Sequence, residues 1–208
     1  MNPKDRERTV LELFTLPAIP EQGRDRLVGV AMALFYYHGI SPIGLDRILA
    51  ETGVSKTTFY KHFESKDELV VATIEMRDAW QMDAWARAVE ALVGENPRDQ
   101  LMGVFDVLDL VINEPTFRGC QFINAASEFP NPHDPIHRAA VRHKQGNRQW
   151  FRELAVRAGA EDPDVFVDAY TMLFEGALVL RQVHDRDDAV RAAKPHLQRL
   201  IDEFVPST

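Results

Sequence analysis

Helix-start signals recur along this chain and limit its fold more than any other feature. Three of them share one form, an asparagine or aspartate followed by a proline: Asn96-Pro97, Asp134-Pro135 and Asp162-Pro163. The polar residue caps the helix, and the proline suits the first helical position, where a missing N–H costs nothing. Ser65 and Glu68 add a capping box, in which each side chain accepts a free backbone N–H at the helix start. Because no stretch alternates apolar and polar residues over a useful strand length, the sequence predicts an all-α protein of about nine helices.

The N-terminal part has the order of a helix-turn-helix domain. Apolar residues at helical spacing run from Leu27 to Phe35, and Gly39 ends that helix. A second helix is expected over 45–52, and Ser55 is expected to cap a third that reaches about Phe63. The other predicted helices cover 65–93, 116–129 and 187–204, together with the three that begin at the proline signals.

The third predicted helix, which Ser55 is expected to cap, has two different faces. At about 100° per residue, Phe59 and Phe63 lie on one face, with Thr57 and Lys61 on the opposite one. Such a helix can anchor itself to a core while presenting short polar and basic side chains to a DNA groove. A helical hairpin with solvated threonines and lysines fits the same spacing, so the pattern alone leaves both interpretations open.

Charge does not exclude DNA binding. The chain has 24 Lys and Arg against 32 Asp and Glu, a formal net charge of −8, but residues 73–208 hold most of the excess acid, with 22 acidic against 15 basic residues. Between Val54 and Phe63 there are Lys56, Lys61 and His62 and no acidic residue. Because phosphate attraction is screened within about 10 Å, a basic patch on an acidic protein is compatible with DNA binding.

The segment from Gly44 to Val70, GLDRILAETGVSKTTFYKHFESKDELV, closely resembles the DNA-binding domain of the tetracycline-repressor (TetR) family, and the resemblance covers about residues 24–72. It implies a homodimer on double-stranded, near-palindromic operator DNA, with the third helix in the major groove and a small-molecule effector. By position, the residues expected near base edges are Lys56, Thr57 and Thr58, and those expected at phosphates are Ser55, Tyr60, Lys61, His62 and Lys66. Ile43 departs from the family pattern, in which many members place a phosphate-binding threonine or serine there.

We expect three parts along the chain. Residues 1–21 form an N-terminal arm, residues 22–72 the three-helix DNA-binding domain, and residues 73–208 a larger helical domain for ligand binding and dimerisation. Pro17 and Pro20 break any helix that starts near Thr9. Acidic residues alternate with the basic ones in the arm, which favours a mobile segment or one packed on the body over an arm in the minor groove.

The C-terminal part is expected to supply the dimer interface and the effector site. The run from Val165 to Leu180 is apolar nearly all round its helix, so all of its sides need to be covered. The family resemblance implies that a second subunit covers one side, and the interior of the same subunit is expected to cover the other. Glu175 is a carboxylate within this run and either orients a polar ligand or pairs with an arginine across the dimer. The candidate lining residues are Trp80, Met102, Phe105, Phe122, Trp150, Tyr170, Phe174 and Glu175, although aromatic residues at this spacing are more often plain core.

Other kinds of site have weaker support. Cys120 is the single cysteine, which excludes an internal disulfide, suits a reducing cytoplasm and offers one candidate redox sensor beside Arg118. His133 and His137 are four residues apart, but Pro135 starts a helix between them and no cysteine or carboxylate cluster completes a metal site. We expect no metal, no cofactor, no signal peptide and no membrane span.

The sequence thus predicts a cytoplasmic, ligand-responsive DNA-binding regulator, most simply a repressor that a small molecule releases from its operator. The alternative is an all-helical small-molecule-binding protein or enzyme without a DNA role, with Glu175 or the histidines as catalysts. No nucleophile–base pair, phosphate loop or cofactor fingerprint supports an enzyme.

Overall fold

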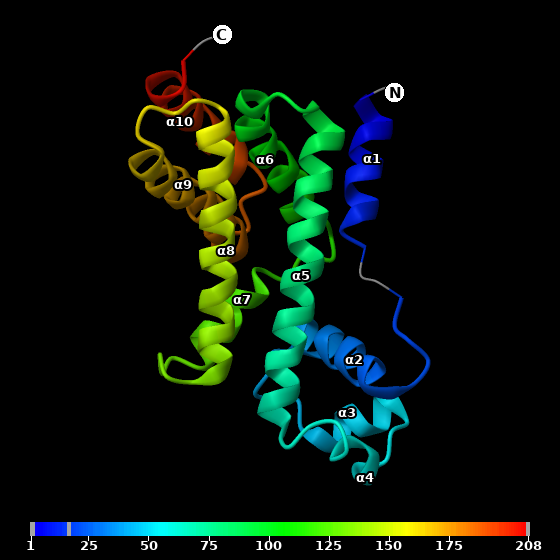
Figure 1. Ribbon diagram of the computed structural model, residues 1–208. Coiled ribbons are helices and arrows are strands. Elements are labelled where there is room, and N and C mark those ends of the chain that lie inside the picture. The colour runs from blue at the N-terminus through cyan, green and yellow to red at the C-terminus, as the bar shows by residue number, and fades with distance from the viewer. Residues whose placement is uncertain (1–2, 16–17, 207–208) are drawn as a thin grey trace. The chain divides into compact units, whose positions relative to one another are not determined.

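The structure is a computed structural model that describes residues 3–15 and 18–206, and within these ranges it contains ten helices and no strand (Figure 1). The helices are α1 (Pro3–Leu13), α2 (Gly23–His38), α3 (Leu45–Thr52), α4 (Lys56–Phe59), α5 (Lys66–Val93), α6 (Pro97–Ile112), α7 (Gln121–Glu128), α8 (Pro135–Arg157), α9 (Pro163–His184) and α10 (Ala189–Phe204). The predicted all-α fold is confirmed. No helix in the described part of the chain is long and apolar enough to cross a membrane.

The three proline start signals begin helices as predicted. The Asn96 side chain accepts the N–H groups of Arg98 and Asp99 at the start of α6. Asp134 accepts the N–H of Ile136 at 2.8 Å in the first turn of α8, and Asp162 caps α9 through the N–H of Val165. These interactions are local, which is why the sequence was enough to predict them.

Three elements differ from the prediction. Helix α4 is only four residues long, because the chain tightens after Phe59 into a turn closed by bonds such as His62 N–H to Phe59 O. Helix α7 begins at Gln121, not near Thr116, because Gly119 has a φ of +88° and Cys120 is extended. The tenth helix, α1, was not counted in the prediction.

Helix α1 is packed. Val10 is fully buried, the Phe14 ring meets Trp85 edge-on with centroids 5.3 Å apart, and Arg6 donates to the carbonyl of Leu92. Helix α1 is therefore packed against α5, while the predicted arm over residues 1–21 stays a prediction. Residues 1–2 and 16–17 of that arm lie outside the described residues.

Contacts divide the described residues into two compact units. One contains residues 3–15, 81–119 and 145–206, and the other contains residues 18–80 and 120–144. Helices α5 and α8 each contribute to both units. The predicted boundaries at residues 21 and 72 stay predictions. The second unit contains α2, α3 and α4 together with α7 and the first part of α8.

The first unit is built on an aromatic core. The rings of Phe105, Phe151, Tyr170 and Phe174 lie with centroids 4.9–5.9 Å apart, mostly edge to face, which is the favoured geometry for aromatic pairs. The Tyr170 hydroxyl donates to the carbonyl of Leu101 at 2.8 Å, so the one polar atom of this core is satisfied. Burial, together with the charge of Asp106, raises the pKa of the Tyr170 phenol well above its usual value.

Candidate nucleic-acid interface

The turn between α3 and α4 is held by bonds among nearby residues and by Arg26 of α2, whose Nε donates to the carbonyl of Thr52 at 2.9 Å. Gly53 has a φ of +68°, a conformation that glycine adopts without steric cost. The Thr52 hydroxyl donates to Ile48 O at 2.8 Å and accepts the N–H of Val54 at 3.3 Å. These bonds fix how the chain leaves α3 and so set the direction in which α4 begins.

Ser55 then caps α4. Its Oγ accepts the N–H of Thr58 at 3.1 Å and lies 2.9 Å from the Thr58 hydroxyl. In the predicted scheme Ser55 binds a phosphate and Thr58 approaches a base, but here each hydroxyl already has the other as a neighbour. Lys56 and Thr57, at the start of the same helix, are exposed.

The two faces of this segment are as predicted. Phe59 is fully buried, Phe63 is 2% exposed, and their ring centroids are 5.7 Å apart. Tyr60 is 53% exposed, and Lys61 and His62 are exposed beside it. Hydrophobic burial therefore fixes the segment from one side while its polar and basic side chains remain in solvent.

Lys66 differs from the other predicted phosphate ligands. Its ammonium donates to the carbonyl of Ile40 at 2.7 Å and lies 5.8 Å from the centre of the Phe35 ring. Burial lowers the pKa of Lys66, against the raising effects of Asp67 and Glu128. One of its three protons is thus committed to the protein, which leaves the others for any phosphate.

Two exposed arginines of this unit were not predicted as site residues. The Arg24 guanidinium lies 5.0 Å from the centre of the Phe63 ring, and Arg47 lies 3.3 Å from the Nε2 atom of His38. Arg24 is far from α4 in sequence, and only the packing of Phe63 brings it there. Ile43 stands where many family members have a hydroxyl side chain, and it is completely buried in the core.

The predicted effector-site residues do not form one group. Phe105, Tyr170 and Phe174 belong to the packed core of the first unit, and Met102, Trp150 and Glu175 lie partly exposed in the same unit. Trp80 and Phe122 belong to the second unit. A shared effector site for these residues stays a prediction.

In the second unit the candidates lie beside ionisable side chains. The Arg77 guanidinium is 4.7 Å from the centre of the Trp80 ring. The Phe122 ring stacks on His143, with centroids 3.3 Å apart and planes 7° from parallel. His143 is 1% exposed, and its Nδ1 lies 2.6 Å from Asp78 Oδ1. Sequence patterns gave no sign of this pair, because Asp78 and His143 lie 65 residues apart.

Cys120, His133 and His137 do not form a common site. Cys120 is 9% exposed and is the N-cap residue of α7, while the Arg118 side chain donates to the carbonyls of Pro115 and Phe117. His137 Nδ1 meets Phe129 O at 2.7 Å, and His133 Nδ1 lies 3.4 Å from Arg138. Among the described residues, no group of three or more His, Cys, Asp or Glu is arranged to hold a metal ion. A redox role for Cys120 stays a prediction.

Known proteins that resemble this chain share its helix-turn-helix segment. The sequence model of the family "Bacterial regulatory proteins, tetR family" matches residues 27–73, which include α3 and α4. A crystal structure of a tetR transcriptional regulator from Streptomyces avermitilis is 31% identical, with a TM-score of 0.76, and the match covers 87% of this chain and 97% of that one.

Two further relatives extend over most of the chain. A TetR-family regulator from Streptomyces coelicolor is also 31% identical, with a TM-score of 0.78 and coverage of 87% of this chain and 95% of that chain. The transcriptional regulator YjdC of Escherichia coli is 23% identical over 179 residues, which are 84% of this chain and 93% of that protein. These relatives are transcriptional regulators and not enzymes. The chain therefore belongs to the TetR family of transcriptional regulators and carries the DNA-binding helix-turn-helix domain of that family.

Proposed function

We propose that this regulator is a repressor that binds a near-palindromic operator as a homodimer and is released by a small molecule. The observation that carries the proposal is the surface of α4 and the turn after it. There Lys56, Thr57, Lys61 and His62 are exposed around a buried Phe59. A short helix anchored from behind and polar in front suits entry into a major groove.

The residues of this surface have two roles in the proposal. Lys56, Thr57 and Thr58 approach base edges and carry sequence preference, whereas Tyr60, Lys61 and His62 hold phosphates and carry affinity. Ser55 supports them mainly as the cap of α4. Lys66 contributes charge near the phosphates while it remains bound to the carbonyl of Ile40.

The proposal places the dimer interface on α9. Val165, Met172 and Val179 are exposed at intervals of seven residues, and Val183 continues the same side; their exposed fractions are 53, 72, 39 and 65%. Seven residues are nearly two helical turns, so these side chains form one stripe. An exposed apolar stripe on a helix of this family fits a second copy of the chain, and a dimer provides the two recognition helices that a palindrome requires.

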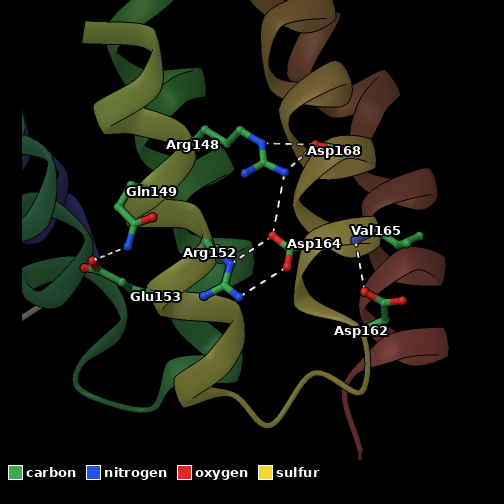
Figure 2. A network of polar contacts seen from close by, with 8 residues as sticks. All are labelled: Arg148, Gln149, Arg152, Glu153, Asp162, Asp164, Val165 and Asp168. Carbon is green, nitrogen blue, oxygen red and sulfur yellow. Dashed lines mark hydrogen bonds and ion pairs between the residues drawn. The ribbon is translucent and has the colours of Figure 1, made fainter. Parts of the chain in front are cut away.

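Ion pairs join α8 to α9 beside this stripe. Figure 2 shows Arg148 and Arg152 of α8 directed at acidic residues of α9. Arg148 Nη2 lies 2.8 Å from Asp168 Oδ1, and Arg152 Nε lies 2.9 Å from Asp164 Oδ1. The guanidinium of Arg152 lowers the pKa of the Asp164 carboxyl. These pairs hold α9 to its own subunit and leave the apolar stripe for the partner.

Release by an effector requires two states of the dimer. A ligand that binds better when the two copies of α4 are wrongly spaced will shift the dimer away from the operator, by no more than its difference in affinity for the two states. The two groups of aromatic candidates, one in each unit, are where we expect such a ligand to bind.

The test is selection of bound sequences from random duplex DNA by the native protein and by three variants. Thr57→Ala should change the preferred bases at one position of each half-site. Lys61→Ala should weaken binding to all sequences and reduce the salt dependence by about one phosphate contact. Lys4→Ala, at an exposed lysine of α1, is the matched control and should change neither.

A near-palindromic consensus with these effects supports the proposal and supplies the operator for an effector screen. No enrichment at low salt would refute DNA recognition by this surface. A consensus unaffected by either variant would place the interface elsewhere.

A further inference from the structure

The turn between α2 and α3 is held by a carboxylate from a distant part of the chain. Glu128, the last residue of α7, accepts the N–H of Ile40 at 2.9 Å through Oε1 and at 3.1 Å through Oε2. It also accepts the N–H of Ser41 at 2.7 Å. Hydrogen bonds from backbone N–H groups to an ionised carboxylate are short and stronger than neutral ones.

The other side of the same turn is held by Lys66, which donates to the carbonyl of Ile40 at 2.7 Å. We call these three residues, Ile40 with Glu128 and Lys66, the clasp. Burial would raise the pKa of Glu128, but the hydrogen bonds from Ile40 and Ser41 and the charge of Lys66 outweigh it and lower the pKa overall. Glu128 is therefore ionised at neutral pH and accepts the N–H groups of the turn as a carboxylate.

Gly39 is required for this approach. It has a φ of +80°, and a Cβ atom there would lie 3.3 Å from Glu128 Oε1. The N–H of Gly39 itself ends α2 by bonding to Phe35 O. The backbone thus turns sharply out of α2 and presents its next two N–H groups to α7.

The clasp lies just before the helix-turn-helix. Helix α3 begins at Leu45, and its N-cap residue, Gly44, has no side chain with which to cap it. The start of α3 is instead fixed by the buried side chain of Ile43 and by the clasp, whose residue Ile40 lies three positions before Ile43. Since α3 supports α4 through the Thr52–Gly53 turn, the position of Glu128 bears on the direction of the recognition helix.

The opposite end of α7 is in contact with a different set of residues. Phe122 stacks on His143 of α8, which is bonded to Asp78 of α5. Glu128 lies six positions after Phe122, which is about 9 Å along a helix. If this short helix moves as one rigid piece, a displacement at Phe122 reaches the clasp.

We propose that Glu128 is a positioning residue for operator binding, and that α7 transmits displacements at Phe122 to the recognition helix through the clasp. The DNA part of this inference rests on the proposed function, whereas the transmission part does not. Without the carboxylate, only a fraction of molecules holds the turn in the binding-competent form, and apparent affinity falls by that fraction. A loss equivalent to one charge-assisted hydrogen bond corresponds to about a 10- to 100-fold weaker affinity.

The first experiment measures operator affinity of Glu128→Ala, Glu128→Gln and Ser127→Ala, using the consensus duplex selected above. We expect Glu128→Ala to bind about 10- to 100-fold more weakly and Glu128→Gln to be intermediate, because an amide oxygen still accepts one N–H. Ser127 is the neighbouring exposed residue and donates to Ile123 O within its own helix, so Ser127→Ala should match the native protein. Sedimentation and thermal melting report whether each variant remains a folded dimer.

If Glu128→Ala does not fold, Glu128→Gln provides the test. A folded, dimeric Glu128→Gln with native melting temperature and weakened operator binding supports positioning, since a purely structural role would lower the melting temperature. A folded variant that binds the operator within twofold of the native protein overturns it.

The second experiment needs no DNA. Backbone amide signals of Ile40 and Ser41 are followed by NMR in Phe122→Leu, with Ser127→Ala as control. A shift of both amides in Phe122→Leu alone supports transmission through α7, and unchanged amides overturn it. If the native protein binds no DNA, the proposed function fails, while this result still decides transmission.

Discussion

His143 allows a quantitative prediction of how stability depends on pH. It is 1% exposed, stacked on Phe122 and bonded to Asp78. Burial, the largest effect, lowers its pKa to about 4, aided by the charges of Lys144 and Arg77 and opposed by Asp78. The imidazole is therefore neutral in the native protein at neutral pH.

The sign follows from proton binding. In the unfolded chain His143 titrates near its ordinary pKa of about 6.5, so between about pH 6.5 and pH 4 the unfolded state binds a proton that the native state does not. Stability is then lost as pH falls through this window. One group with these two pKa values lowers the free energy of unfolding by about 2 kcal/mol at pH 5 relative to pH 8.

The assay is urea unfolding of the native protein and of His143→Gln at pH 8 and pH 5, at one fixed protein concentration. Glutamine keeps a donor for Asp78 and a flat group against Phe122 but does not titrate. The native protein should lose about 2 kcal/mol more than the variant between the two pH values. Equal losses in both proteins would refute the reasoning and show that His143 is solvated or paired as a cation in the native state.

Three further predictions concern the core, the cap of α4 and the dimer. Tyr170→Phe removes the hydrogen bond to Leu101 and should lower the free energy of unfolding in urea by about 1 kcal/mol, while Tyr60→Phe at an exposed site should change it little; equal effects would contradict the buried bond. Ser55→Ala removes the cap of α4 and should lower the free energy of unfolding by about 1 kcal/mol and weaken operator binding; native values for both would show that the cap is dispensable. Met172→Asp should convert the dimer to monomer in sedimentation, whereas Val141→Asp, at an exposed valine of α8, should not; a dimeric Met172→Asp would move the interface away from α9.

Much of the fold could be predicted because its signals are local. Caps at Asn96 and Asp162 and the spacing of Phe59 and Phe63 act within a few residues, so they appear in the sequence as they act in the structure. The exposed surface around α4 could be predicted for the same reason, because its buried and exposed residues alternate within a few positions. The late start of α7 was not predicted because Gly119 interrupts an otherwise helical composition. Helix α1 was not predicted because the contacts that pack it, such as that of Phe14 with Trp85, join residues far apart in the sequence.

Contacts between distant residues could not be predicted in the same way. Glu128 reaches Ile40 across 88 residues, and His143 reaches Asp78 across 65. No periodicity links such pairs, because each depends on how whole helices pack. For the same reason the sequence placed Trp80 and Phe122 in one group with Phe105 and Tyr170, which the tertiary structure assigns to separate units.

The amino-acid pattern is enough to predict that this chain is helical and where most of its helices begin. It also predicts which short segment presents Lys56, Thr57 and Lys61 beside a buried Phe59. Those properties follow from capping, helical periodicity and hydrophobic burial, which operate over one or two turns. The packing of distant helices is what turns Lys66 inward to the carbonyl of Ile40 and brings Glu128 to the turn before the helix-turn-helix. A backbone N–H or carbonyl accepts any suitable partner that packing brings within reach, so side-chain identity alone cannot say which partner that is.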